Sequence, residues 1–273
     1  MTDNYVVMGN PIAHSKSPEI HRAFAAQTQQ ALNYQTLLVP LEAFADTAKQ
    51  FFAAAQARGA NVTVPFKEQA FALCDELSER AKLAGAVNTL IKLDNGKLRG
   101  DNTDGLGLVS DLQAHVDLHG AKVLLLGAGG AAKGCLLPLL EAGVASIDIF
   151  NRTHAKAQQL AAVAPATCQA CESESLAQGY DVVINSTSAS LNGQLPGVPG
   201  RIIAAHTLCY DMMYGKEITA FNQWAQAQGA KQVIDGLGML VGQAAHSFNL
   251  WRGVLPAVTP VLQQLRQQLE QQS

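Results

Sequence analysis

A glycine-rich turn, set between an apolar segment and a helical pattern, constrains the fold of this chain more than any other feature. Residues 123–126 form an apolar run typical of a parallel strand that is buried on both faces. The chain then passes through Gly127-Ala128-Gly129-Gly130-Ala131-Ala132, and leucines at helical spacing follow. This order of strand, G-x-G-x-x-G/A turn and helix predicts a dinucleotide-binding βαβ unit.

The small residues of this turn each have a physical reason. Gly127 permits the tight turn, Gly129 lacks the Cβ that would hold a pyrophosphate away from the backbone, and Ala132 lets the helix pack closely on the strand. The start of the helix then offers free N–H groups and the positive end of its dipole to the phosphates. The alternative, an ordinary strand-to-helix turn, explains the pattern less well.

Composition narrows the class of protein. The chain has 273 residues, of which 48% are hydrophobic and 15% charged, so it can hold two ordinary domains or one large one. It has no basic run, no apolar window of about 18 residues and no signal peptide, so we expect neither a nucleic-acid partner nor a membrane one. Five scattered cysteines fit the reducing cytoplasm, and the C-x-x-C pair Cys168 and Cys171 has no companion, so no metal site is predicted.

From residue 122 onward, short apolar strands alternate with helical patterns. Six such strands, at 123–126, 146–150, 167–170, 181–185, 207–210 and 232–234, predict a doubly wound parallel sheet. Ligands bind such sheets beyond the carboxyl ends of the strands. The end of the second strand has Asn151 and Arg152, with Lys156 one turn later and no acidic residue in the place where NAD-binding sheets usually have one. Two cations favour a 2′-phosphate and hence NADP, although a solvated basic helix start is the alternative.

The first hundred residues predict a second, smaller α/β domain. Strands are expected at 5–8, 34–39 and 60–64, and a helix over 41–58 that Gly59 ends. Asp94-Asn95-Gly96 between apolar runs predicts a hairpin. The helical pattern that runs to Trp251 and the last helix from Pro256 exceed what a nucleotide domain needs, so we expect them to return to the first domain.

The loop after the first strand has two interpretations. Ser17 is well placed as the N-cap of a helix, with Pro18 at the first helical position. However, His14, Ser15 and Lys16 crowd the same loop, and hydroxyl groups past a strand end equally suit a polyhydroxylated ligand.

Two later charges are also ambiguous. Lys67 falls in the first turn of a helix, where a cation opposes the helix dipole, so it is either functional or a solvated surface lysine. Asn61 and Thr63 precede it and point to the same side of their strand. Asp104 either caps the next helix or acts as a functional acid.

Taken together, the motifs of this chain resemble the shikimate dehydrogenase family over nearly its whole length. Any one motif is weak, whereas all of them in this order are highly specific. They are Gly9-Asn10-Pro11 with Ser15-Lys16-Ser17-Pro18, Asn61-Val62-Thr63-Val64-Pro65-Phe66-Lys67, Gly85-Ala86-Val87-Asn88-Thr89, Asn102-Thr103-Asp104-Gly105, Gly127-Ala128-Gly129-Gly130-Ala131, Asn151-Arg152-Thr153, Tyr210-Asp211-Met212-Met213-Tyr214 and Gly236-Leu237-Gly238-Met239.

The resemblance implies NADP-linked reduction of 3-dehydroshikimate to shikimate, a step in the biosynthesis of chorismate and the aromatic amino acids. It implies that Lys67 and Asp104 are the catalytic pair. The implied substrate-binding residues are Ser15, Ser17, Asn61, Thr63, Asn88, Tyr214 and Gln243. The implied cofactor-binding residues are Gly127, Ala128, Gly129, Gly130, Ala131, Asn151, Arg152, Thr153, Lys156, Thr187, Met212, Gly236 and Met239.

The chain departs from the family pattern in two places. Ser190 lies where glycine is usual, and Lys156 stands where arginine is common. A lysine cannot make the bidentate phosphate contacts of an arginine, which weakens the preference for NADP without reversing it.

The resemblance also sets the expected architecture and the alternatives. Residues 1–103, completed by helices within 240–273, are expected to form the substrate-binding domain, and residues 104–239 the NADP-binding Rossmann domain. The active site is expected in a cleft between the two domains. The expected assembly is a monomer or a homodimer. A quinate/shikimate dehydrogenase of broader specificity is the first alternative. A glutamyl-tRNA reductase is disfavoured because no cysteine occupies a suitable loop, and a non-catalytic NADP-binding protein because both Lys67 and Asp104 are present.

Overall fold

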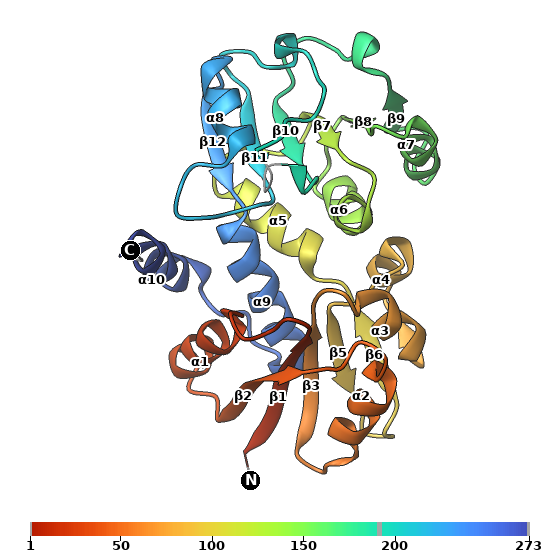
Figure 1. The fold of residues 1–273 in the computed structure, drawn as a ribbon, viewed down its shortest axis with the longest axis vertical. Helices are drawn as coiled ribbons and strands as arrows, with labels where there is room; N and C mark the ends of the chain where they lie inside the picture. Colours follow the sequence, from red (N-terminus) through yellow and green to blue (C-terminus); the bar gives the residue numbers. More distant parts are fainter. Residues whose placement is uncertain (1, 190–192, 272–273) are drawn as a thin grey trace. The chain divides into compact units, whose positions relative to one another are not determined.

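Two α/β units, each with one six-stranded sheet, make up the residues that the structure describes, 2–189 and 193–271 (Figure 1). The structure is a computed structural model. One unit consists of residues 1–107 with 241–264, and the other of residues 108–240 with 265–273. We call them unit 1 and unit 2. The division falls within three helices, which are α5 (Asp104–Gln113), α9 (Leu237–Arg252) and α10 (Val258–Gln271).

Unit 1 contains a mixed sheet with the strand order β2-β1-β3-β5-β6-β4. Strand β5 runs antiparallel to both of its neighbours, and the other strand pairs are parallel. The elements are β1 (Asp3–Gly9), α1 (Ser17–Gln27), β2 (Leu32–Leu38), α2 (Phe44–Ala53), β3 (Ala57–Val62), α3 (Lys67–Leu73), β4 (Glu76–Leu77), α4 (Glu79–Ala84), β5 (Thr89–Lys92) and β6 (Leu98–Asp101).

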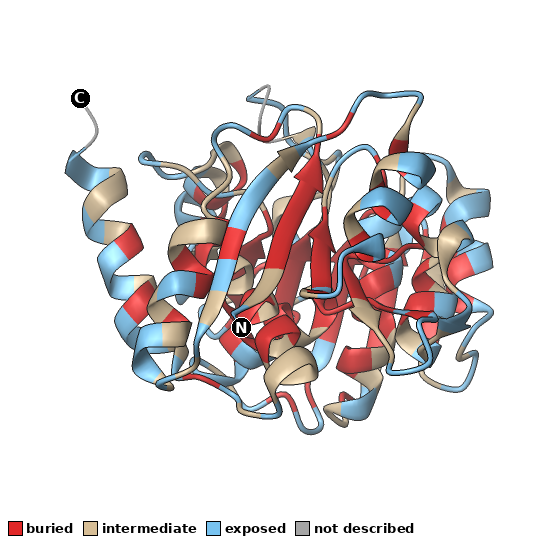
Figure 2. Ribbon diagram, turned by 90° about the horizontal axis from the view of Figure 1, so that it is seen from below, coloured by how far each residue is buried: buried red, intermediate tan, exposed pale blue. Residues whose placement is uncertain are grey.

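The core of unit 1 lies under the central strands. Strands β1 and β3 are buried along most of their length, whereas Tyr34 is the only buried residue of the edge strand β2 (Figure 2). Val6, Met8, Val62, Phe66 and Leu90 belong to one buried hydrophobic cluster. The predicted hairpin at residues 94–96 is confirmed, since β5 and β6 pair across it.

The helix predicted over residues 41–58 is wrong in its second half. Helix α2 ends at Ala53, and Gly59 lies inside β3 instead of ending a helix. The indole of Trp251, which donates a hydrogen bond of 3.0 Å from Nε1 to the carbonyl oxygen of Leu90, covers this glycine. A Cβ on Gly59 would lie 2.6 Å from Cε2 of the indole, so the glycine serves a close approach by a residue distant in the sequence.

We expect Gly59→Ala to lower the free energy of unfolding by about 1–3 kcal/mol, because the methyl group overpacks the contact with Trp251. Chemical denaturation measures the change. Gly215→Ala is the control, since a Cβ there meets only an ordinary contact at 3.7 Å. Equal stability of the two variants would contradict this explanation of the glycine.

Unit 2 confirms the predicted doubly wound parallel sheet. Its strand order is β12-β11-β10-β7-β8-β9, and every pair is parallel. The elements are β7 (Lys122–Leu126), α6 (Gly130–Glu141), β8 (Ser146–Phe150), α7 (His154–Ala161), β9 (Cys168–Cys171), the short 3-10 helices η1 (Ser173–Ser175) and η3 (Gly200–Ile202), β10 (Val182–Asn185), β11 (Leu208–Asp211), α8 (Ala220–Ala227) and β12 (Gln232–Asp235).

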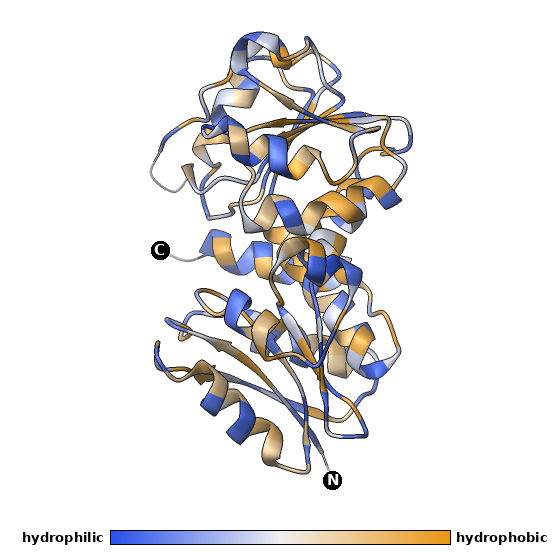
Figure 3. Ribbon diagram, turned by 90° about the vertical axis from the view of Figure 1, so that its right-hand side faces the viewer, coloured by the Kyte–Doolittle hydropathy of each residue, from blue (hydrophilic) through white to orange (hydrophobic). Residues whose placement is uncertain are grey.

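The strands of unit 2 are apolar because helices cover both faces of its sheet. All four residues of β10 are buried, as are four of the five residues of β7, and the strands in this part of Figure 3 are largely orange. The order of the strands reverses between β7 and β10, which is where ligands bind in sheets of this type.

The cysteines are free thiols. Cys168 and Cys171 begin and end β9, and burial raises the pKa of both thiols to about 11. Both therefore stay protonated and weakly reactive at neutral pH.

Across the described part of the chain, no group of His, Cys, Asp and Glu side chains is placed to hold a metal ion. No described helix has the length and apolar character needed to cross a membrane.

Candidate functional site

The sheet of unit 1 brings four loops to one edge. Strands β1 and β3 are parallel neighbours, so the loops that follow them lie together. Strand β5 runs the other way, with Thr89 opposite Asn61, so Asn88 precedes it at the same edge. Strand β6 reverses again, with Asp101 opposite Thr89, and therefore brings Asp104 to this edge as well.

Lys67 and Asp104 form an ion pair at this edge. Each residue begins a helix, α3 and α5 respectively, and Nζ of Lys67 lies 2.6 Å from Oδ2 of Asp104. The side chains are 30% and 16% exposed, so part of the Lys67 side chain is open to solvent. The other carboxylate oxygen, Oδ1, accepts a hydrogen bond of 2.8 Å from Nδ2 of Asn88. Lys67 is thus held in place by a carboxylate, and Asp104 uses both oxygens for side chains.

Other predicted substrate residues contact this pair or lie on the loops that meet at the same edge. Nδ2 of Asn88 is also 3.3 Å from Oε1 of Gln243, which lies on α9. Thr63, partly exposed, follows β3 four residues before Lys67. Ser15 lies in the loop that follows β1, the neighbouring strand.

The prediction that Ser17 caps α1 is wrong. Ser17 is the first residue of the helix, and the preceding Lys16 makes no side-chain cap bond. The Oγ of Ser15 instead accepts a hydrogen bond of 3.3 Å from the backbone N–H of Ser17. The Ser17 side chain is buried and hydrogen-bonded to the hydroxyl of Tyr34.

Asn61 is buried, and protein groups already occupy its amide. Its Oδ1 accepts hydrogen bonds from the Tyr34 hydroxyl at 2.7 Å and from His21 Nε2 at 3.1 Å. Its Nδ2 donates to the carbonyl oxygen of Asn88 at 3.1 Å and to Oγ of Ser247 at 3.0 Å. Burial raises the pKa of Tyr34 well above its ordinary value, so the hydroxyl keeps the proton that it donates.

His21 is fully buried and neutral. Its ring stacks on that of Tyr34, with the centroids 4.2 Å apart, and burial lowers its pKa to about 3. Because the unfolded chain takes up a proton near pH 6.5 and the folded chain does not, acid favours the unfolded state.

We therefore expect the free energy of unfolding to fall by roughly 2 kcal/mol between pH 7 and pH 5 through His21 alone. His21→Gln removes the titrating group and keeps an N–H donor for Asn61. Denaturation of both proteins across this pH range measures the difference, and parallel pH curves would rule out a neutral buried His21.

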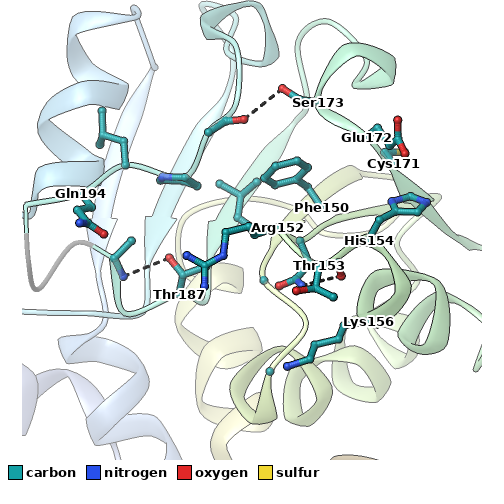
Figure 4. Close-up of a pocket in the computed structure, with 18 of the residues that line it drawn as sticks. Phe150, Arg152, Thr153, His154, Lys156, Cys171, Glu172, Ser173, Thr187 and Gln194 are labelled. Carbon is teal, nitrogen blue, oxygen red and sulfur yellow. Dashed lines mark hydrogen bonds between the residues drawn. The ribbon is translucent and has the colours of Figure 1, made fainter.

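Unit 2 has a pocket of about 750 Å³ at the carboxyl ends of β7, β8, β9 and β10 (Figure 4). Seven predicted cofactor residues line it. They are Gly127, Gly129, Asn151, Arg152, Thr153, Lys156 and Thr187.

The glycine turn leaves space for a ligand. Gly127 has φ +111°, a conformation that L side chains rarely adopt, and a Cβ there would collide with the side chain of Ser186. A Cβ on Gly129 or on Gly130 would meet nothing within 4 Å. The small residues therefore leave the backbone at the start of α6 open to a phosphate group.

Two cations line the pocket where β8 ends. Arg152 and Lys156 are exposed, and neither has a carboxylate partner among the described residues. Figure 4 shows the guanidinium of Arg152 directed toward Thr187, and Lys156 extending toward the ribbon of the turn after β7. Asn151 fixes the local backbone, since its Nδ2 donates to the carbonyl oxygen of Thr153 at 2.8 Å. Unpaired cations in a pocket provide a binding site for an anion.

Sequence reasoning missed part of this pocket. Its lining includes His154 at the start of α7, Glu172 and Ser173 after β9, and Gln194. The rule that ligands bind past strand ends applied to the third strand as much as to the second, but the end of β9 lacked a conspicuous polar motif.

Six predicted cofactor residues and Tyr214 are not among the lining residues of this pocket. Gly130 and Ala131 are exposed at the start of α6, whereas Ala128 and Met212 are buried. Gly236 packs against the backbone of Met212. The backbone N–H of Met239 donates to the Tyr210 hydroxyl at 3.2 Å. Tyr214 is exposed after β11. Ser190 lies outside the described residues. The roles of these residues stay predictions.

Comparisons with known proteins point in one direction. The chain matches the shikimate dehydrogenase substrate binding domain over residues 7–90, shikimate / quinate 5-dehydrogenase over residues 110–192 and the shikimate 5'-dehydrogenase C-terminal domain over residues 236–266. It is 59% identical over 272 residues to a shikimate dehydrogenase (NADP(+)) from Shewanella halifaxensis (strain HAW-EB4), which covers 98% of this chain and 97% of the relative.

Solved structures share the fold of this chain over nearly its whole length. An Ael1 enzyme from Pseudomonas putida is 42% identical with a TM-score of 0.92, over 97% of this chain and 98% of that one. Shikimate 5-dehydrogenase from Thermus thermophilus, solved in complex with NADP(H) and shikimate, is 32% identical with a TM-score of 0.86, over 97% of this chain and 99% of that one.

Proposed function

Because the chain belongs to the shikimate dehydrogenase family, we propose that it catalyses the NADPH-dependent, reversible reduction of 3-dehydroshikimate to shikimate with Lys67 and Asp104 at the reacting carbonyl. The observation that supports these residue roles is the 2.6 Å ion pair, held by Asn88 at an edge where four loops meet. The reaction is a step in the biosynthesis of chorismate and the aromatic amino acids.

Lys67 is the proposed proton donor. Reduction of a ketone adds a hydride to the carbonyl carbon and a proton to the oxygen, and negative charge develops on that oxygen between the two events. An ammonium group beside the oxygen stabilises this charge and donates the proton. Asp104 orients the ammonium group, and in the reverse direction Lys67 takes the proton from the alcohol.

The remaining substrate residues are proposed to fix the ring of the substrate. Ser15 and Ser17 bind its carboxylate at the start of α1, where a helix N-terminus favours an anion. Thr63, Asn88, Gln243 and Tyr214 bind its hydroxyl groups. For Asn61, whose amide is already bonded to protein groups, we propose contact with the substrate only through the residues it supports.

The pocket of unit 2 suits NADP, which supplies the hydride when bound. We propose that the turn from Gly127 to Ala131 holds the pyrophosphate, because its backbone is open to a phosphate group. The adenosine 2′-phosphate is assigned to Asn151, Arg152, Thr153 and Lys156. The nicotinamide half is assigned to Thr187, Met212, Gly236 and Met239.

The same reasoning extends to organisation and location. We assign substrate binding to residues 1–103 with 240–273, and NADP binding to residues 104–239. We expect a monomer or homodimer, since each polypeptide contains both proposed sites. The five free cysteines support a reducing compartment, the cytoplasm.

Cofactor reduction, followed spectrophotometrically with shikimate or quinate as substrate, tests the function. We expect turnover with shikimate and NADP, and Lys67→Ala should lower kcat about 100-fold or more while KM for shikimate changes little. Lys97→Ala, at an exposed lysine of the hairpin, is the matched control. Near-wild-type turnover of Lys67→Ala would remove the catalytic assignment, and equal activity with quinate would favour the broader quinate/shikimate dehydrogenase.

Arg152→Ala tests the cofactor assignment. The variant should raise KM for NADP about tenfold or more and leave KM for NAD nearly unchanged, because only NADP has the 2′-phosphate that the guanidinium pairs with. Arg99→Ala, an exposed arginine of β6, is the control. Equal changes for NADP and NAD would show that Arg152 does not read the phosphate.

A further inference from the structure

The Asn88 amide belongs to a closed ring of hydrogen bonds with three buried hydroxyl groups. Its Nδ2 donates to Oγ1 of Thr103 at 3.0 Å, which lies 3.1 Å from Oγ of Ser247. Ser247 Oγ is 2.7 Å from Oγ1 of Thr89, and Thr89 donates at 2.8 Å to Oδ1 of the same Asn88. Asn88 is 2% exposed and the three hydroxyl residues are fully buried, so water does not compete for these groups.

The backbone fixes the orientation of the Asn88 amide. The backbone N–H of Thr103 donates to Oδ1 of Asn88 at 2.9 Å, which marks that atom as the acceptor end of the amide. The hydroxyl of Thr89 lies 2.8 Å from the same oxygen, and that of Thr103 lies 3.2 Å from it. Ser247 Oγ also donates to the carbonyl oxygen of Gln243 at 3.0 Å, which fixes this side chain to the backbone of α9.

The orientation of the amide decides what Asn88 presents to Asp104. With Oδ1 held by Thr89 and by the backbone of Thr103, the NH₂ group faces Oδ1 of Asp104 at 2.8 Å. A flipped amide would place its oxygen against the carboxylate, two acceptors with no proton between them. Because Asn88 occupies Oδ1 of Asp104, Oδ2 is the oxygen that pairs with Lys67.

We propose that Thr89 and Ser247 are positioning residues for the reaction, acting through Asn88 and Asp104 on the ammonium group of Lys67. This inference rests on the proposed function, in which Lys67 and Asp104 are the catalytic pair. Neither Thr89 nor Ser247 touches the substrate, because both side chains are fully buried.

Asn61 supports the ring from its other side. Its Nδ2 donates to Oγ of Ser247 at 3.0 Å, while Tyr34 and His21 hold its Oδ1. The aromatic cluster around His21 is thereby connected to the catalytic pair by hydrogen bonds alone.

Thr89→Val tests the proposal, because it replaces the hydroxyl by a methyl group of similar size and opens the ring. We expect kcat to fall about tenfold, the effect of losing one buried hydrogen bond in the oriented state, while KM for shikimate changes less. Thr89→Ser, which keeps the hydroxyl, should retain kcat near that of the natural protein. Ser247→Ala opens the ring at another bond and should act like Thr89→Val.

Thr207→Val is the matched control. Thr207 is also fully buried and donates to the carbonyl oxygen of Tyr180 at 2.6 Å, but it lies in unit 2 before β11. This variant should lower stability without lowering kcat. If Thr89→Val and Ser247→Ala, shown to be folded by circular dichroism, turn over at the natural rate, the positioning role is overturned.

A double-mutant cycle separates positioning from a general loss of structure. In an Asp104→Asn background, Thr89→Val should lower kcat no further, because the carboxylate that the ring aligns is absent. A second full tenfold loss would overturn the proposal. If Asp104→Asn alone keeps the kcat of the natural protein, the proposed function is overturned. If Asp104→Asn loses activity but Thr89→Val keeps the natural kcat, only the role of the ring is overturned.

Discussion

The hydrogen bonds to the Asn88 amide determine the arrangement of the polar centre of unit 1. Buried amide and hydroxyl groups that lack a partner are costly, so each must find one within the protein. The sheet meets this requirement through strand direction. With β5 antiparallel between β3 and β6, the chain places Asn61, Asn88 and Thr103 at one edge, whereas a parallel β5 would have carried Asn88, which precedes it, to the opposite edge. The antiparallel pairing of β5 with β3 and β6 therefore also brings Lys67 and Asp104 together.

Unit 2 meets the opposite requirement, since it has to leave groups without partners. No side chain covers the backbone at Gly129 and Gly130, and the cations Arg152 and Lys156 have no carboxylate partner in the described part of the unit, so both are available to an anion. The parallel sheet makes this possible by delivering the starts of α6 and α7 to the same edge. A positive φ at Gly127 completes the turn.

The sequence predicted those features whose cause is local. The glycine turn, the alternation of strands and helices and the Asn-Gly hairpin depend on residues near one another in the chain, and the structure agrees with them. The predictions for Gly59 and Ser17 are wrong because the surroundings of these residues come from Trp251 and Tyr34, which are distant in sequence. The roles of Ser247 and His21 are not predictable from the sequence for the same reason. An isolated serine or histidine on a helix has no signal of its own until the fold supplies its partners.

The two units therefore differ in how the proposed reaction depends on them. A cation that binds phosphate acts over several ångströms through an exposed field, which salt screens and a neighbouring cation partly replaces. The ring around Asn88 acts through single hydrogen bonds that hold the amide in one orientation. If the amide flips, no neighbouring charge can restore the hydrogen bond that it donates to Asp104. Lys67 is partly exposed and needs rigid support to stay beside a substrate oxygen, and a buried network of hydrogen bonds gives that support where an apolar core would not. The polar residues beneath the catalytic pair are in this sense part of the proposed active site, although they lie out of reach of the substrate.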